Sequence, residues 1–184
     1  MPDCAVTRLD ATDFDTAIGR CAIAWRADAV ARFQLPGTDP SRTFARFTGD
    51  DVHPIPVPAD GPRAAAVAAV RAHLDGDLDD LRWIPLDLTG LPEFHRAVYA
   101  VTRAIDPGHT LSYGEVARRC GAAGAAQAVG QALGSNPIPL IVPCHRVLAA
   151  DHSLHGFSAP GGIGTKSELL AIEGTPGFGE PTLF

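Results

Sequence analysis

The segment from Asn136 to Val147, Asn-Pro-Ile-Pro-Leu-Ile-Val-Pro-Cys-His-Arg-Val, constrains this chain more than any other part of its sequence. Its apolar run, Ile138–Val142, predicts a short buried strand that ends at Pro143. Directly after that proline stand a thiol and an imidazole, Cys144 and His145. The pattern therefore places two reactive side chains at the end of a buried element.

Two interpretations of Cys144 follow from these residues. The thiolate is the reactive form of cysteine, and a cysteine held on a stiff turn beside a potential base is suited to be a nucleophile. A lone cysteine after an apolar strand is more commonly a small core residue, and the histidine beside it is then structural. The two residues by themselves leave both interpretations open.

The chain has 184 residues, enough for one large domain or two small ones with a sizeable core. It contains no run of about 18 apolar residues, so we expect no membrane span. The start, Met-Pro-Asp-Cys, lacks the basic and apolar regions of a signal peptide. The four cysteines are widely spaced and form no CxxC pair, which indicates a reduced, cytoplasmic protein.

The formal net charge of -6 argues against a general nucleic-acid binder. The charge is unevenly distributed, since residues 1–91 hold 14 acidic and 9 basic residues, whereas residues 92–184 hold 7 and 6. We therefore expect any contact with DNA to involve the second half, through only a few phosphate contacts.

In the first half, the pattern predicts a hairpin over 16–35 that turns near Ala27-Asp28, an extended connection over 51–60, a helix over 62–74 and an acidic connector over 75–91. The alternating residues that should face the core are Cys21, Ile23 and Trp25 on one strand and Ala31, Phe33 and Leu35 on the other.

In the second half, the pattern predicts a helix over 94–105, a helix that opens at Ser112 and runs through Cys120, and a helix over 125–134. The last two are joined by a glycine-containing turn, which is typical of a helix-turn-helix. A last helix is expected to begin with the capping box Thr165–Glu168 and to end at Glu173-Gly174.

On the helix over 125–134, Val129 and Leu133 should face the core. The opposite face consists of small and neutral residues that let a backbone approach another surface closely, namely Gln127, Gly130, Gln131 and Gly134. Ordinary helix packing explains the same pattern, so the pattern alone does not assign a function.

Several motifs taken together are far more specific than any one of them. They are Ser112-Tyr113-Gly114-Glu115-Val116-Ala117, Ala128-Val129-Gly130, Asn136-Pro137, Pro143-Cys144-His145-Arg146-Val147, and Lys166 with Leu169-Leu170 and Glu173-Gly174. In this order and spacing, the chain resembles the O6-alkylguanine-DNA alkyltransferases, which repair DNA by moving an alkyl group onto their own cysteine. The resemblance is strong over residues 91–174 and weak over the N-terminal half.

The resemblance implies an α+β protein with a ribonuclease-H-like α/β domain over residues 1–88 and a helical, winged-helix-like domain with a helix-turn-helix over residues 89–184. It implies a monomer without a cofactor that binds double-stranded DNA containing O6-alkylguanine in the minor groove and flips the damaged base. Some relatives hold a structural zinc, but Cys4 and Cys21 lack a matching pair of histidines, so we expect no metal.

The resemblance also assigns roles to residues. Cys144 would accept the alkyl group, and His145, acting through a water, would take its proton while Glu173 orients the imidazole. Tyr113 would shape the pocket and donate a proton to the leaving guanine, and Asn136 would hold the turn before the cysteine. The substrate-binding residues would be Val147, Phe157, Ser158 and Lys166, and the DNA-binding residues Ala126, Gln127, Gly130, Gln131 and Arg146.

Three positions depart from the family pattern. Gln127 stands where an arginine commonly fills the gap left by the flipped base, and glutamine carries no charge and has less reach. Phe157 stands where a tyrosine is common, and the loop 158–162 is two residues longer than usual.

Two other functions are consistent with parts of the sequence. Alkyl-damage sensors resemble this chain and bind flipped alkylguanine without transfer, but they typically replace the reactive cysteine, which is present here. A cysteine hydrolase would need a separate base, because neighbouring side chains in an extended segment point to opposite sides. No separate Cys/His signature indicates such a base.

Overall fold

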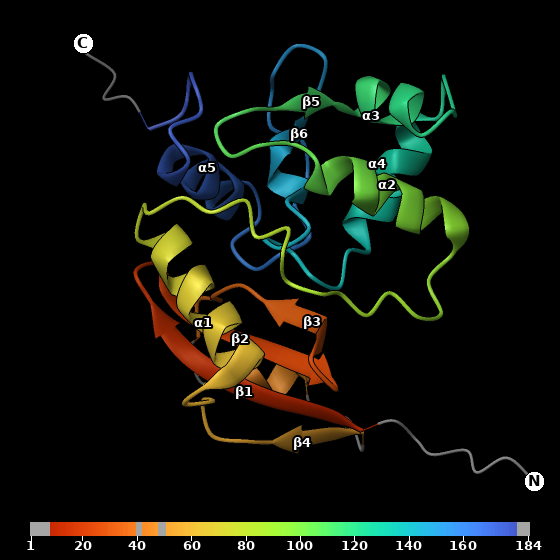
Figure 1. Ribbon diagram of the computed structural model, residues 1–184. Helices are drawn as coiled ribbons and strands as arrows, with labels where there is room; N and C mark the ends of the chain where they lie inside the picture. Colours follow the sequence, from red (N-terminus) through yellow and green to blue (C-terminus); the bar gives the residue numbers. More distant parts are fainter. Residues whose placement is uncertain (1–7, 40–41, 48–50, 180–184) are drawn as a thin grey trace, which may run out of the picture.

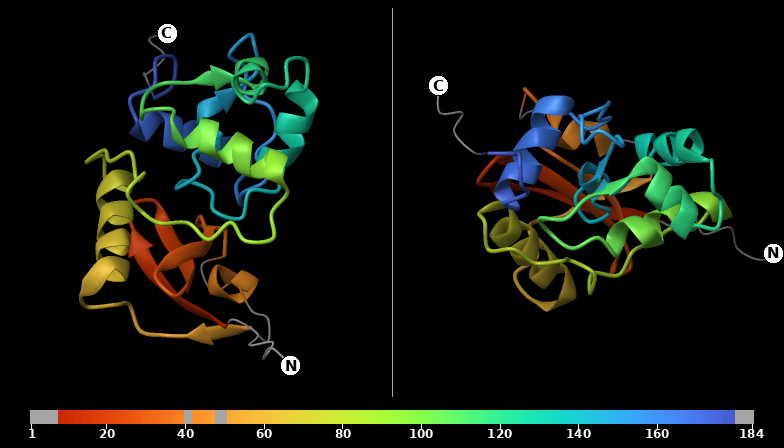
Figure 2. Two further views of the ribbon diagram at one scale, coloured as in Figure 1. Left: turned by 45° about the vertical axis from the view of Figure 1, so that its right-hand side comes forward. Right: turned by 90° about the horizontal axis from the view of Figure 1, so that it is seen from above.

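The computed structural model describes residues 8–39, 42–47 and 51–179 and shows a mixed α and β protein (Figures 1 and 2). The N-terminal half contains β1 (Leu9–Thr16), β2 (Gly19–Arg26), β3 (Ala29–Gln34), the 3-10 helix η2 (Phe44–Phe47), β4 (Val52–Pro54) and α1 (Gly61–Leu74). The C-terminal half contains α2 (Glu93–Arg103), β5 (Leu111–Ser112), α3 (Tyr113–Arg119), α4 (Ala126–Gly134), the 3-10 helix η3 (Cys144–Arg146), β6 (Val147–Leu148) and α5 (Ile163–Ile172). None of the described helices is long and apolar enough to cross a lipid bilayer.

The N-terminal sheet has the strand order β3-β2-β1-β4, with β4 parallel to β1 and the other pairs antiparallel. The predicted hairpin is confirmed as β2 and β3. Strand β1 was not predicted, because it carries three aspartates, a residue type that is depleted in strands. The extended segment over 51–60 is confirmed, and its first residues form the short strand β4.

Ala31 of the hairpin faces the side of the sheet opposite to the one predicted. A β-bulge between Ala24 and Trp25 shifts the register, so that Trp25 pairs with Val30. Val30 therefore enters the main core, while Ala31 packs in a small cluster on the other face of the sheet. A bulge adds one residue to a strand and so reverses the alternation beyond it.

A single main core joins the two halves of the protein. Residues of β2, β3 and α1 belong to the same buried cluster as residues of α2, α3, α4 and α5. In Figure 1, α1 covers one face of the sheet, and the helices of the C-terminal half lie above the sheet, on the side where α1 ends. Figure 2 shows the same arrangement from two other directions. Backbone bonds add to this connection, since the Phe33 amide donates to the Pro137 carbonyl at 2.9 Å.

The predicted helices of the C-terminal half are confirmed as α2, α3 and α4, and the turn between α3 and α4 contains Gly121 and Gly124. Val129 and Leu133 are buried, as the helical spacing predicts. The Tyr99 hydroxyl, which is buried, donates to the Ala132 carbonyl at 2.8 Å and joins α2 to α4.

The prediction of a strand over Ile138–Val142 is wrong, although the segment is buried. Leu140 has a φ of 74°, and the Val142 amide donates to the Ile138 carbonyl at 2.9 Å, so the chain turns back on itself. Prolines at 137 and 139 lack amide hydrogens and cannot take part in a regular ladder.

The predicted capping box Thr165–Glu168 is also wrong, although α5 does end next to Glu173-Gly174 as predicted. The helix begins at Ile163 after Gly162, so Thr165 already lies inside it and its hydroxyl donates to the Pro160 carbonyl at 2.7 Å. Gly161 has a φ of 80°, and a Cβ there would lie 2.1 Å from the Thr165 Oγ1. The loop before α5 therefore requires glycine at this position.

The capping box at the start of α3 gives the first testable prediction. The Ser112 Oγ accepts the Glu115 amide at 3.2 Å, and the Glu115 carboxylate accepts the Ser112 amide at 2.7 Å. Ser112→Ala should lower the free energy of unfolding by about 1 kcal/mol, because it leaves a helix N–H group unsatisfied. Urea unfolding measures the change.

Ser167→Ala in α5 is the matched control, because no hydrogen bond to the Ser167 hydroxyl is seen within the described residues. That variant should change the free energy of unfolding by less than about 0.5 kcal/mol. Equal effects of the two substitutions would contradict the capping role of Ser112.

Candidate active site

Cys144 begins a single 3-10 turn, and the preceding turn fixes its position. The Asn136 side chain makes three hydrogen bonds: its amide nitrogen donates to the Val142 carbonyl at 2.9 Å and to the Cys144 Sγ at 3.3 Å, and its oxygen accepts the Ile138 amide at 3.0 Å. Asn136 thus replaces the missing backbone bonds of the turn and also points a donor at the sulfur.

The surroundings of Cys144 favour the protonated thiol at rest. Burial raises the pKa of Cys144, while the Asn136 amide and the Lys166 ammonium group oppose that effect. A buried thiol is inert until a base removes its proton. The hydrogen bond from Asn136 and the positive charge of Lys166 would then stabilise the thiolate that forms.

His145 and Glu173 lie next to each other in the interior. The His145 Nε2 lies 2.9 Å from the Glu173 Oε1, and both side chains are buried. Burial lowers the pKa of His145, against the opposing effect of Glu173, so the imidazole is kept neutral. Its other nitrogen, Nδ1, is buried and has no hydrogen-bond partner among the described residues. Nδ1 is therefore the atom that is free to accept a proton.

The Glu173 carboxylate accepts hydrogen bonds from several parts of the chain. Arg146 donates to it twice, from Nε at 2.9 Å and from Nη2 at 2.8 Å, and His73 of α1 lies 3.1 Å from its Oε1. Burial by itself would raise the pKa of Glu173, but the hydrogen bonds from His145, His73 and Arg146 hold it well below its ordinary value. Glu173 is thus a buried, ionised carboxylate.

Two residues of this cluster differ from the sequence-based expectation. Arg146 was predicted to contact DNA, but its side chain is buried and its Nη1 donates to the Ile105 carbonyl at 2.6 Å. A guanidinium in that position cannot reach a phosphate, so the prediction for Arg146 is wrong. His73 was missed, because no local pattern relates it to a residue 100 positions away.

A pocket lies directly above the Cys144 sulfur. It is lined by Tyr113, Gly130, Leu133, Gly134, Cys144, Gly156, Phe157, Ser158 and Lys166. The predicted residues Tyr113, Phe157, Ser158 and Lys166 are therefore brought together around the cysteine. Val147, also predicted to bind substrate, does not line the pocket; its side chain is buried and its carbonyl accepts the Lys166 Nζ at 2.7 Å.

Tyr113 and Lys166 form part of the pocket wall. The Lys166 Nζ lies 5.8 Å from the centre of the Tyr113 ring. Burial raises the pKa of Tyr113, and the nearby Cys144 adds to the effect, so the phenol keeps its proton at neutral pH. The phenol is thus available as a proton donor.

The outward face of α4 lies at the edge of this pocket. Gln127 and Gln131 are exposed, Ala126 and Gly130 are partly buried, and Gly130 also lines the pocket. The face that was predicted to bind DNA is therefore accessible and continuous with the opening above Cys144.

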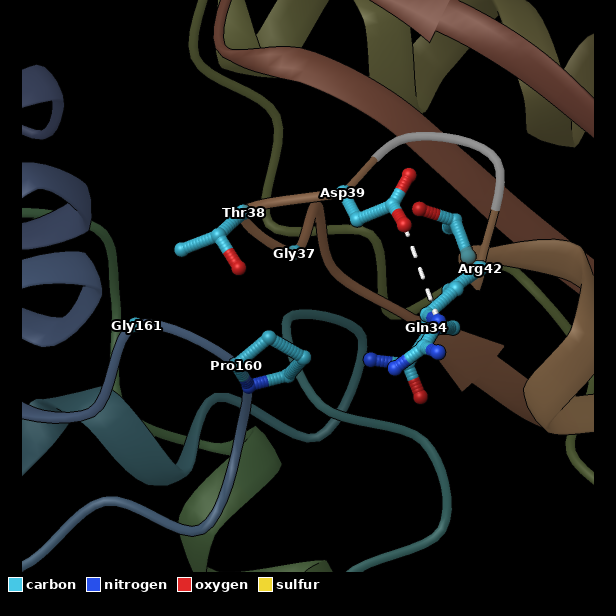
Figure 3. A pocket seen from close by; sticks show the side chains of 8 residues that line it. Gln34, Gly37, Thr38, Asp39, Arg42, Pro160 and Gly161 are labelled. Carbon is cyan, nitrogen blue, oxygen red and sulfur yellow. Dashed lines mark ion pairs between the residues drawn. The ribbon is translucent and has the colours of Figure 1, made fainter.

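The loop before α5 borders the pocket of Cys144 and also hollows on the side of the N-terminal half. Phe157 and Ser158 line the pocket of Cys144, whereas Pro160 and Gly161 line a second hollow together with Gln34, Gly37, Thr38, Asp39, Arg42 and Thr43 (Figure 3). In the second hollow, the Arg42 Nε lies 3.6 Å from the Asp39 carboxylate. The loop thus separates the pocket from a polar part of the N-terminal half.

Within the described residues, no group of three or more His, Cys, Asp or Glu side chains is arranged to hold a metal ion. Cys21 is buried, and burial raises its pKa to about 12, as for an unreactive core thiol. Cys4 lies outside the described residues.

Comparisons with known proteins agree with this geometry. A sequence model described as "6-O-methylguanine DNA methyltransferase, DNA binding domain" matches residues 93–175. A methylated-DNA–protein-cysteine methyltransferase of Mycolicibacterium paratuberculosis is 42% identical over 158 residues, which cover 84% of this chain and 93% of that protein.

Solved structures show the same similarity. The crystal structure of Mycobacterium tuberculosis OGT in complex with DNA aligns with a TM-score of 0.72 at 35% identity and covers 90% of this chain and 93% of that one. The O6-methylguanine-DNA methyltransferase of the archaeon Pyrococcus kodakaraensis aligns with a TM-score of 0.66 at 26% identity, covering 91% of this chain and 99% of that one. This chain therefore belongs to the methylated-DNA–protein-cysteine methyltransferase family.

Proposed function

We propose that Cys144 is the residue that receives the alkyl group when this protein repairs DNA, and that the group comes from the O6 atom of guanine. The observation that carries the proposal is the position of the Cys144 sulfur below a pocket that opens beside α4. His145, in the same turn, supplies a base, and Glu173, at the C-terminal end of α5, supplies the group that orients it. This is the nucleophile, base and orienter arrangement of hydrolytic triads, applied to a thiol.

The proton of Cys144 leaves toward His145. A water molecule passes it to the free Nδ1, while the Nε2–H group donates to Glu173 and fixes the imidazole in the tautomer that can act as a base. The Glu173 carboxylate then stabilises the imidazolium that forms. Asn136 and Lys166 stabilise the thiolate.

The thiolate attacks the alkyl carbon, so a carbon–sulfur bond forms and the bond from carbon to the guanine oxygen breaks. The electron pair of the broken bond stays on guanine, to which Tyr113 donates a proton. The product on Cys144 is a thioether, which no group of the site converts back to a thiol. Each molecule therefore acts once.

We propose that α3 and α4 give the protein access to the alkylated base, as the helix-turn-helix of a DNA-binding domain over residues 89–184. Helix α4 would enter the minor groove of double-stranded DNA, and the alkylated base would flip out of the duplex into the pocket. Residues 1–88 would form a ribonuclease-H-like domain, and the protein would act as a monomer. Gln127 is exposed at the start of α4, and it would occupy the space that the flipped base leaves.

Replacing the proposed acceptor tests the assignment directly. Cys144→Ala should transfer no methyl group from O6-methylguanine DNA, because the nucleophile is absent, whereas the wild type should reach a plateau of about one methyl group per molecule. Intact-protein and peptide mass spectrometry measure the amount and the site. Cys120→Ala is the matched control, since Cys120 is only partly buried and lies outside the pocket. Methylation of the Cys144→Ala variant would refute the proposal.

Glu173→Gln tests the relay behind the cysteine. The amide cannot stabilise an imidazolium, so the single-turnover rate constant should fall by about 100-fold, while the DNA dissociation constant changes little because Glu173 is buried. Rapid-quench kinetics and a binding titration measure the two quantities, at a temperature at which circular dichroism shows the variant to be folded, because the substitution leaves the buried charge of Arg146 uncompensated. An unchanged rate constant with weaker DNA binding would assign Glu173 to a structural role.

Substitutions of Gln127 test the proposal that α4 enters the minor groove and that this side chain replaces the flipped base. Gln127→Arg should tighten DNA binding. The slope of log K for DNA against the logarithm of the salt concentration should become steeper by about 0.9, the value for one added phosphate contact. Gln127→Ala should slow repair in duplex DNA much more than transfer from the free alkylated base, which requires no flipping. Glu93→Ala, at an exposed position of α2 outside the predicted DNA-binding face, is the control. Equal slowing of both substrates by Gln127→Ala would show that another side chain fills the gap.

A further inference from the structure

We propose that His73, in the last turn of α1, is a positioning residue for the reaction at Cys144, and that it acts by donating a hydrogen bond to Glu173. The inference rests on the proposed roles of Glu173 and His145. It assigns a part in the chemistry to the N-terminal half, whose described residues do not line the cysteine pocket.

The contact is buried and specific. The His73 Nε2 lies 3.1 Å from the Glu173 Oε1, and both side chains are 1% exposed. In Figures 1 and 2 the end of α1 is directed toward α5, whose C-terminal end carries Glu173. The contact therefore joins the two halves of the protein at the carboxylate that orients His145.

The other nitrogen of His73 determines the direction of this hydrogen bond. The Asp79 amide donates to the His73 Nδ1 at 3.3 Å, so Nδ1 is an acceptor and the imidazole proton lies on Nε2. His73 thus donates to the carboxylate. A leucine of similar volume cannot make this bond, whereas the amide nitrogen of a glutamine can.

His73 shares one oxygen atom with the catalytic base. The Glu173 Oε1 accepts from His73, His145 and Arg146, and its Oε2 accepts from Arg146 and, at 3.4 Å, from the Gly108 amide. Each donor reduces the electron density that the carboxylate offers to His145. Removing the His73 donor should let Glu173 hold the protonated form of His145 more strongly, and should also leave the carboxylate less tightly fixed.

These two effects predict the behaviour of His73→Leu. Protonated His145 cannot accept the proton of Cys144, and with a raised His145 pKa it persists to higher pH. The low-pH decline of the single-turnover rate constant should therefore move to higher pH, and the rate constant at its plateau should fall by about three- to tenfold through poorer positioning. His73→Gln should stay within about twofold of the wild type.

The measurements separate positioning from stability. Transfer from O6-methylguanine DNA is followed between pH 5 and pH 9 at a temperature at which every variant is folded by circular dichroism. The ionisation of His145 is followed by NMR of the ¹⁵N-labelled imidazoles in the same variants. Val70→Ala, at a buried position of the same helix, is the matched control that destabilises α1 without touching Glu173.

The proposal predicts a shifted profile and a shifted His145 titration for His73→Leu, and neither shift for His73→Gln or Val70→Ala. A His73→Leu profile that coincides with the wild type, or a His73→Gln variant that is as impaired as His73→Leu, would overturn it. Failure of the proposed function looks different, because the wild type itself would then transfer no methyl group to Cys144. The NMR titration still tests the hydrogen bond in that case.

Discussion

The site depends on the hydrogen bonds that converge on the buried carboxylate of Glu173. It lies at the C-terminal end of α5 and accepts hydrogen bonds from η3, from the last turn of α1 and from the Gly108 amide. An ionised carboxylate in the interior is stable only when it is fully paired, and loss of one charged partner leaves an uncompensated charge that costs about 3–5 kcal/mol. The elements that surround Cys144 are therefore held in one arrangement by a single group.

The same pairing explains why Arg146 follows the Cys-His pair. Its guanidinium neutralises Glu173 and donates to the Ile105 carbonyl, so η3 is joined at once to α5 and to the end of α2. Arginine suits this position because its planar fork of donors can serve the carboxylate and a carbonyl together. Arg146 thus holds the elements of the site together through buried contacts.

The surroundings of Cys144 combine two opposite requirements. Burial raises the pKa of Cys144 and keeps the thiol protonated, while the Asn136 amide and the Lys166 ammonium group act in the opposite direction and favour the thiolate. The pocket above the sulfur has walls from α3, α4, the loop 156–158 and α5. Its shape therefore depends on the packing of the whole C-terminal half.

Local patterns in the sequence predicted the β2–β3 hairpin, the helices α1 to α4 and the adjacent pair Cys144 and His145. These features depend on alternation, helical spacing, capping residues and contiguous residues, all of which act over a few positions. The place of Glu173 beside His145 was predicted only by the resemblance to a known family, and the structure brings the two side chains to 2.9 Å. The strand predicted over Ile138–Val142 failed because apolar residues specify burial but not conformation. Here the turn is stabilised by the Asn136 side chain and requires a positive φ at Leu140.

By itself, then, the sequence determined the order of most elements, the residues that we propose as nucleophile and base, and the family to which they point. Only the tertiary structure decided that Arg146 is buried, that Val147 holds Lys166 through its carbonyl, and that His73 lies against Glu173. The reason is physical: these three facts depend on contacts between residues far apart in the chain. Such contacts form only when the sheet, α1 and the helices of the C-terminal half pack into one core.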